Sequence, residues 1–338
     1  MKVAIRIALM VAGFAVAGIV LWRAFDGFDL ASVGSALGNL SWWDIGGLTV
    51  VFVALLVAEA YLSAAFVPGL SLWHGAVTWL GSNAVASVVP GPSDVPLRYR
   101  MFRSWGLAPA SAATASAGAT LINVAAKLVL PAAAAVGIWA GHVDVGNVRG
   151  LVVSACVTCG VVVGVVGFAF GSEARTATGA RLVAKLVRRD ALARGIVRYR
   201  NEAAALLRVC WRQAVVGITL VSALTVVIFV WCMRAVGIAA PTASWVALFC
   251  VWALVRGVTV LPTMPGDAGV SEVAFVSLLS EVADGAGVNT ITAGIVLYRA
   301  ITWIGPIPLG VAAIWVWRLT LRDRVGPNDR ELDDLEAV

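Results

Sequence analysis

Charged residues are scarce in this chain. Asp, Glu, Lys and Arg make up 13% of its 338 residues, 60% are hydrophobic, and the mean hydropathy is +0.91. A soluble globular domain is about 45–50% apolar and about 25% charged. The composition therefore predicts an all-α polytopic membrane protein, with spans of roughly 20 residues each. It excludes functions that need a large soluble catalytic domain.

The chain also lacks the residue sets of common enzymes. It has two histidines, His74 and His142, and five cysteines, all in or beside apolar stretches. Cys156 and Cys159 form a C-x-x-C pair, but a redox or metal site needs solvent access and further ligands. No Ser/His/Asp set or phosphate-binding glycine loop is present. We therefore expect packing cysteines, and no catalytic residue, metal, cofactor or enzymatic activity.

Apolar runs long enough to cross a bilayer are present at 4–22, 44–66, 149–171 and 213–236. The first follows Lys2 and has no cleavage site close behind it, which favours a signal anchor over a signal peptide.

Four further apolar stretches are interrupted by proline or glycine. The runs 107–140, with Pro131, and 288–317, with Pro306, predict bent or broken helices. The stretches 73–90 and 245–264 end in Pro/Gly-rich turns and predict re-entrant hairpins. Together the runs predict six full crossings plus two hairpins.

The distribution of cations predicts the orientation. With the N-terminus inside, nineteen of the 25 Lys and Arg residues fall on the cytoplasmic side, and only Arg23 and Arg149 fall outside. Cationic loops stay cytoplasmic, so both termini are predicted to be cytoplasmic. Twenty-two of the cations are Arg, a bias typical of GC-rich bacterial genomes, which indicates a bacterial plasma membrane.

The segment 172–212 carries ten cations against three acidic residues. Its apolar residues recur at loosely helical spacing, which favours an amphipathic helix on an anionic membrane surface. A plain topology signal with no further role is an equal alternative. Nucleic acid is not expected as a partner, because this basic surface would lie against a bilayer.

Two regions resemble each other at an offset of 175 residues. Pro90-Gly91 matches Pro265-Gly266, and Pro131 matches Pro306. Three crossings separate the copies, so the second copy is predicted to be inverted, which is a transporter architecture. The predicted division is as follows: 1–43 signal anchor and outer interfacial segment, 44–140 first repeat, 141–171 connecting span, 172–212 basic segment, 213–317 second repeat, 318–338 acidic tail.

Ionisable residues lie within or beside the apolar segments, where a charge at a helix centre costs about 2.5–3.5 kcal/mol on insertion scales. Because this cost is high, most of them should face one another or a wet cavity. Helix N-termini after the two Pro-Gly turns would favour an anion there. The residues are Glu59, Asp94, Lys127, Arg256, Asp267, Glu272 and Arg299.

Each group of residues has a functional and a structural interpretation. Arg98, Arg256 and Arg299 would bind a phosphate bidentately, with Lys127 beside them and the four acids as counter-ions or proton acceptors. Alternatively, Arg98 is an interfacial anchor, Glu59 satisfies a helix end, and Glu272 with Arg299 forms a structural ion pair. Lys127 requires an internal partner under either interpretation.

Two motifs resemble a known family. NAVASVVPGPSDVPLRYRMFRSWG (83–106) resembles the first signature of the lysylphosphatidylglycerol synthase transmembrane region, also called the flippase-like family. LPTMPGDAGVSEVAFVSLL (261–279) and LYRAITWIGPIPLG (297–310) resemble the second signature more closely. Glu272, Tyr298 and Arg299 fall on its positions, which implies that Tyr298 also contacts the headgroup. Asp267 and Ala268 replace part of the usual glycine-rich turn.

The resemblance implies lipid translocation and not the activity of the full-length synthases, which carry a soluble aminoacyltransferase domain. The leading hypothesis is a lipid flippase that moves an anionic phosphate-bearing lipid from the inner to the outer leaflet, with proton coupling. The cargo is either a polyprenyl-phosphate-linked sugar or a modified phospholipid. The alternative is a non-transporting membrane partner of a cell-envelope glycosyltransferase or another lipid-synthesis enzyme; an intramembrane transferase is least favoured.

Overall fold

In the computed structural model, every regular element of the described residues is a helix. The backbone alone is described for 121, 122 and 190–208. The described residues are 40–67, 69–89, 93–139, 190–259, 267, 269–283 and 285–322, with Gly34, Ser35, Gly38, Val153, Val157 and Gly160 apart from them.

The chain forms two similar series of helices. The first comprises α3 (Trp42–Ala65), α4 (Leu72–Val88), α5 (Asp94–Ser104) and α6 (Pro109–Trp139). The second comprises α9 (Asp190–Ala235), α10 (Trp245–Val258), α11 (Val270–Val282), α12 (Val288–Arg299), the π-helix η3 (Ala300–Ile304) and α13 (Pro306–Arg322). The order of long helix, two short helices and long helical region is therefore the same in both.

Four helical regions are long and apolar enough to cross a membrane: Trp42–Ala65, Pro109–Trp139, Val209–Ala235 and Val288–Leu321. They correspond to four of the predicted regions, so the chain is a multi-pass membrane protein. The predicted spans 4–22 and 149–171 lie outside the described residues.

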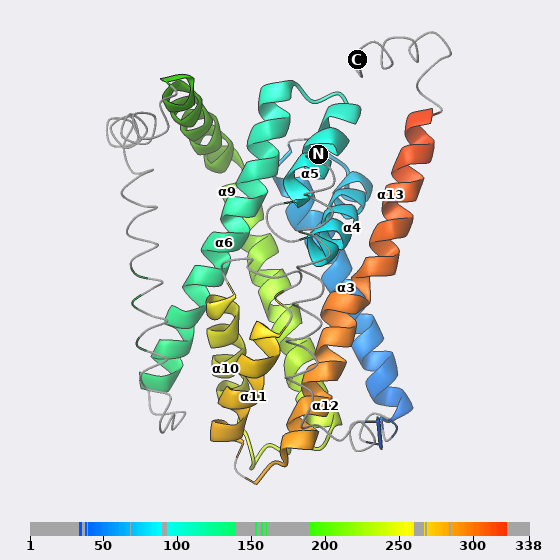
Figure 1. The fold of residues 1–338 in the computed structure, drawn as a ribbon, viewed down its shortest axis with the longest axis vertical. Helices are drawn as coiled ribbons and strands as arrows, with labels where there is room; N and C mark the ends of the chain where they lie inside the picture. The colour runs from blue at the N-terminus through cyan, green and yellow to red at the C-terminus, as the bar shows by residue number, and fades with distance from the viewer. Residues whose placement is uncertain are drawn as a thin grey trace, which may run out of the picture.

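The two pairs of short helices enter the molecule from opposite ends. α4 runs from one end to the middle and α5 returns to the same end, while α10 and α11 do the same from the other end (Figure 1). Serine residues begin two of these helices, because the Ser71 and Ser244 hydroxyls accept backbone N–H groups of the first turn. Both hairpins therefore turn near the middle of the molecule.

One long helical region of each series packs on the hairpin of the other. α6 packs on α10, α13 packs on α4, and α3 packs along α9. Glycines permit this close approach: a Cβ at Gly257 would overlap the ring of Pro131, and a Cβ at Gly310 would overlap the backbone of Leu80. The two series are therefore intertwined.

Two elements sharpen the expectations. α6 continues as one α-helix across Pro131, so the helix predicted to be bent or broken is not broken there. α9 runs without a break from Asp190 to Ala235, so one helix joins the basic segment to the predicted second repeat. Between 288 and 322 the irregularity is the π-helical turn η3, which ends just before Pro306. The chain from 190 to 235 contains no proline, which explains the continuous α9.

Candidate functional site

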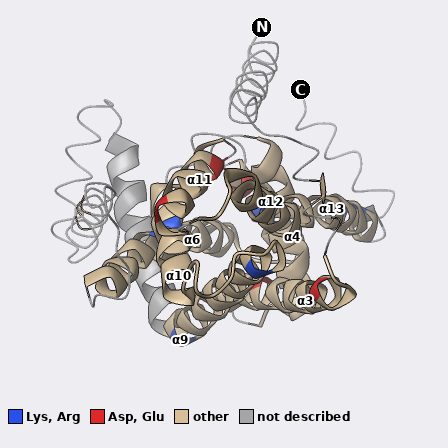
Figure 2. Ribbon diagram, turned by 90° about the horizontal axis from the view of Figure 1, so that it is seen from below, with Lys and Arg blue, Asp and Glu red and all other residues tan. Residues whose placement is uncertain are grey.

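A set of ionisable side chains gathers where the two hairpins turn, and we call it the central charge cluster. Viewed along the helices, Lys, Arg, Asp and Glu occupy few positions of the ribbon (Figure 2). Four members are cations and four are acids, so the cluster is balanced in formal charge. Its members are Glu59, Asp94, Arg98, Lys127, Arg256, Asp267, Glu272 and Arg299.

Glu272 fixes the start of α11 and also holds a cation. Its Oε2 accepts the backbone N–H of Gly269 at 2.7 Å and the hydroxyl of Ser271 at 3.0 Å. Its Oε1 accepts Nε of Arg299 at 2.7 Å. A carboxylate at a helix N-terminus also complements the helix dipole. The ion pair between Glu272 and Arg299 is therefore present, and Arg299 lies over the ring of Trp303, 4.5 Å from its centroid.

Lys127 reaches from α6 to both ends of the turn between α10 and α11. Its Nζ donates to the carbonyl oxygen of Thr259 at 2.8 Å, just past the C-terminus of α10. It also lies 3.5 Å from Oδ2 of Asp267, whose φ of 57° marks the turn. The internal partner that Lys127 requires is therefore this turn. A helix C-terminus attracts a cation, because its last carbonyls lack intrahelical donors.

Arg98 links the first hairpin to α6. Its guanidinium pairs with Asp94 at 2.8 Å, one helical turn earlier on α5. Longer contacts of 3.5 Å join it to the Ser82 hydroxyl on α4 and to the Ser116 carbonyl on α6. The side chain is 12% exposed, so Arg98 is largely enclosed and not a simple surface anchor.

Arg256 and Glu59 are the two cluster members for which the described residues provide neither an ion pair nor a side-chain hydrogen bond. Nε of Arg256 is buried without a partner, and its guanidinium lies 5.9 Å from the ring centroid of Trp252. The charges of Arg256 and Arg98 act on Glu59, and that of Arg256 also acts on Lys127. A buried donor without an acceptor is costly, so this site favours a ligand with acceptor oxygens.

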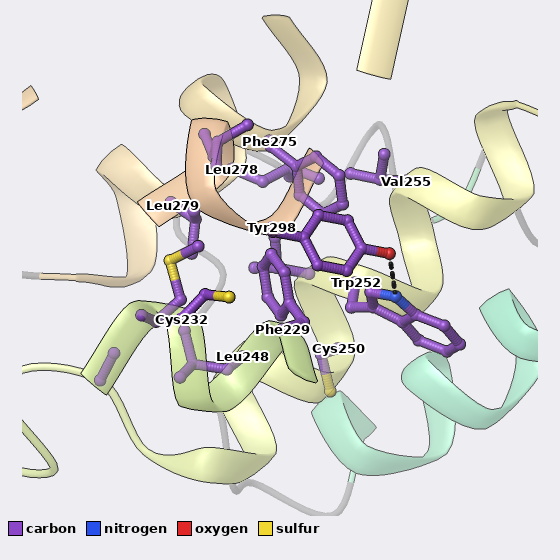
Figure 3. Close-up of a cluster of buried hydrophobic side chains, with 14 of the residues drawn as sticks. Phe229, Cys232, Leu248, Cys250, Trp252, Val255, Phe275, Leu278, Leu279 and Tyr298 are labelled. Atoms are coloured by element: carbon purple, nitrogen blue, oxygen red, sulfur yellow. Dashed lines mark hydrogen bonds between the residues drawn. The ribbon is translucent and has the colours of Figure 1, made fainter. Parts of the chain in front are cut away.

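Tyr298 lies in an aromatic core (Figure 3) and directly precedes Arg299 of the central charge cluster in the chain. Its ring packs edge-to-face against Phe229 and Phe275, and it is 4% exposed. Its hydroxyl accepts the indole N–H of Trp252 at 3.0 Å. In this structure Tyr298 therefore positions Trp252, and Trp252 in turn lies against Arg256.

An apolar groove with a volume of about 1020 Å³ lies between α6, α9 and α10, and we call it the lateral groove. It is lined by small and aliphatic residues of α6 and α9, and by tryptophans. Trp211 and Trp231 come from α9, and Trp245 and Trp252 from α10. Trp252 thus belongs both to the groove wall and to the surroundings of Arg256.

The turn residues Pro90, Gly91, Pro265 and Gly266 lie outside the described residues. Sequence reasoning missed Trp252 and the lateral groove. A signal for Trp252 exists, because it precedes Arg256 by four residues and the two share a helix face. The groove brings α6 against α9 and α10, and its α6 lining residues precede those of α9 by more than 80 residues, so it leaves no comparable pattern in the sequence.

Groups of three or more potential metal ligands are absent from the part of the chain that the structure describes. Cys210, Cys232 and Cys250 are buried free thiols in that part. Burial among apolar side chains fits packing cysteines.

Comparison with curated proteins found no significant match. The family model of the lysylphosphatidylglycerol synthase transmembrane region matches residues 10–310, which is most of the chain and includes both hairpins. This family indicates a membrane function related to lipids. With its helical spans and its central charge cluster, the chain belongs to the lysylphosphatidylglycerol synthase transmembrane-region family.

Proposed function

We propose that this protein is a flippase that moves a lipid with a phosphate-bearing anionic headgroup from the inner to the outer leaflet. The observation that carries the proposal is Arg256, whose buried Nε has no hydrogen-bond partner within the described residues. A phosphate oxygen would supply the missing acceptor and the counter-charge. The cargo is a modified phospholipid or a polyprenyl-phosphate-linked sugar.

The architecture supports a path between leaflets. The two hairpins enter from opposite ends and turn near the central charge cluster, as in inverted-repeat transporters with sites near the bilayer midplane (Figure 1). In this proposal the chain has six full crossings and two re-entrant hairpins, arranged as inverted repeats. Rocking of one repeat against the other would expose the cluster to each leaflet in turn.

Ion pairs stabilise most of the charges of the central charge cluster inside the molecule. Arg98, Arg299 and Lys127 each have an acidic partner at 2.8, 2.7 and 3.5 Å. A passing phosphate would compete with these carboxylates for the cations. Such exchange would give Arg98, Arg299 and Lys127 a phosphate in place of each displaced carboxylate, so these three cations would keep an anionic partner in a low-dielectric medium.

Glu59 is the group we assign to proton coupling. It has no ion-pair partner within the described residues, whereas Asp94, Asp267 and Glu272 each pair with a cation. The charge of Arg256 acts on it, so headgroup phosphate at Arg256 would change the charge that Glu59 experiences. Replacing Glu59 with Gln should remove the response of transport to an imposed pH gradient while downhill exchange remains. An unchanged pH response would contradict this assignment.

The decisive experiment is lipid translocation in proteoliposomes. Fluorescent phosphatidylglycerol should be exchanged between leaflets by the wild-type protein, and an impermeant quencher measures the outer fraction. Arg256→Ala should slow exchange at least about tenfold, because one charge-assisted hydrogen bond contributes about 1.5–3 kcal/mol. The control is Arg318→Ala, which removes an exposed arginine of α13 far along the chain from the cluster.

Failure would be equally clear. If the wild-type protein accelerates neither fluorescent phosphatidylglycerol nor a polyprenyl-phosphate-linked sugar over protein-free vesicles, the flippase proposal is wrong. If both arginine variants slow exchange equally, Arg256 has no specific role in binding the headgroup.

A further inference from the structure

We infer that the lateral groove is the site of the hydrocarbon chain of a lipid whose anionic headgroup lies at Arg256. This inference rests on the proposed function, because it assigns the other half of the same ligand. The groove volume of about 1020 Å³ lies at the upper end of the range for ligand pockets, about 300–1,000 Å³.

The residues that line the groove favour contacts with a hydrocarbon chain over contacts with a polar ligand. The small residues Ala126, Ser222 and Ala223 leave room between α6 and α9, and none of the described residues that line the groove is ionisable. The one lining indole in the buried core, Trp252, already donates its N–H to Tyr298, so it presents no unsatisfied donor there. A polar ligand would therefore find almost no hydrogen-bond partners along this wall.

The length of the groove matches the bilayer. Its wall on α9 extends from Trp211 to Trp231. Twenty helical steps at 1.5 Å each give about 30 Å, which is the usual thickness of the hydrocarbon core. Trp231 is fixed at its end, since its N–H donates to Asp44 on α3 at 2.9 Å and its ring packs on Gly47. Tryptophans at both ends are typical of membrane interfaces.

The groove and the central charge cluster are continuous through Trp252. One side of this residue belongs to the groove wall, and the guanidinium of Arg256 lies 5.9 Å from its ring centroid. The apolar wall, the indole and the guanidinium of Arg256, whose buried Nε has no hydrogen-bond partner within the described residues, therefore follow one another. This is the order of chain and anionic head in an amphiphile. This charge complementarity selects a lipid as the occupant over an uncharged apolar segment.

Photolabelling in proteoliposomes tests the site directly. The probe is phosphatidylglycerol with a photoreactive diazirine on one acyl chain, and the labelled residues are mapped by mass spectrometry. We expect label to concentrate on 125–130 and 211–231, and Ala223→Trp to reduce it at least fivefold by filling the groove. The matched control is Ala312→Trp, another exposed alanine, which lies on α13 outside the groove.

A second probe separates this inference from the proposed function. Diacylglycerol with the same photoreactive chain lacks the phosphate. Arg256→Ala should abolish the preference for phosphatidylglycerol over diacylglycerol and leave groove labelling by diacylglycerol unchanged. If the groove is labelled but the protein does not exchange lipid between leaflets, the flippase proposal is wrong and the tail site stands. If the protein exchanges lipid but the label does not concentrate in the groove, the tail site alone is wrong.

Two further outcomes would also overturn the tail site. If Ser222→Cys forms a disulfide with Cys156 or Cys159 in the membrane, the chain's own segment 149–171 occupies the groove. If label spreads evenly over all lipid-facing helices, with no loss in Ala223→Trp, the groove holds no lipid chain in preference to the rest of the surface.

Discussion

At the scale of single residues, the ion pair of Glu272 and Arg299 stabilises the fold as well as bearing charge. The two side chains are 10% and 15% exposed, so removing one partner leaves a largely buried charge. Breaking a buried pair typically costs about 3–5 kcal/mol, whereas replacing both partners with apolar residues is often neutral.

We therefore predict that Arg299→Leu sharply lowers the melting temperature in detergent. The double variant Glu272→Leu with Arg299→Leu should recover part of the loss, because no unpaired charge remains. Recovery will be incomplete, since Glu272 also accepts the N–H of Gly269. An Arg299→Leu variant as stable as wild type would show that the pair contributes nothing to folding.

The hydrogen bond between Trp252 and Tyr298 gives a second prediction at this scale. Tyr298→Phe removes the acceptor and leaves a buried indole N–H, at a cost of about 1–3 kcal/mol. The double variant with Trp252→Phe should be less destabilised than the two single effects combined, because donor and acceptor disappear together. Thermal unfolding of all four proteins measures the coupling, and strict additivity would contradict it.

At the scale of helices, the contact between α6 and α10 depends on a glycine. A Cβ at Gly257 would overlap the ring of Pro131, so we expect Gly257→Ala to destabilise the protein by about 1–3 kcal/mol. Adding Pro131→Ala should restore much of this, because it removes the ring and returns a backbone donor. Gly46→Ala on α3 is the control, since nothing lies within 4 Å of the new methyl group.

The helices show which features the sequence could predict. Hydropathy located the four regions that are long and apolar enough to cross a membrane, because this signal is local, whereas the re-entrant hairpins stay a prediction. The Pro131–Gly257 contact and the lateral groove could not be predicted, since each arises between segments more than 80 residues apart in the chain. For the site, the ionisable residues were identifiable by their cost in hydrocarbon, but their pairing was left open between alternatives.

At the scale of the whole molecule, the hairpins predict opposite accessibility of two exposed loops. Ala108 precedes α6 at the end where α4 and α5 enter, and Ala240 precedes α10 at the other end (Figure 1). With cytoplasmic termini, an impermeant maleimide should label Ala108→Cys from the cytoplasmic side and Ala240→Cys from outside. Labelling of both from one side would refute the inverted arrangement.

The uninterrupted α9 has a mechanical consequence. A helix of 46 residues is about 69 Å long, roughly twice the thickness of the hydrocarbon core. Because α9 is one continuous helix, its arginine-rich first part and the part that forms the groove wall belong to the same element. A displacement of the arginine-rich end therefore has a continuous hydrogen-bonded backbone along which it can reach the groove wall.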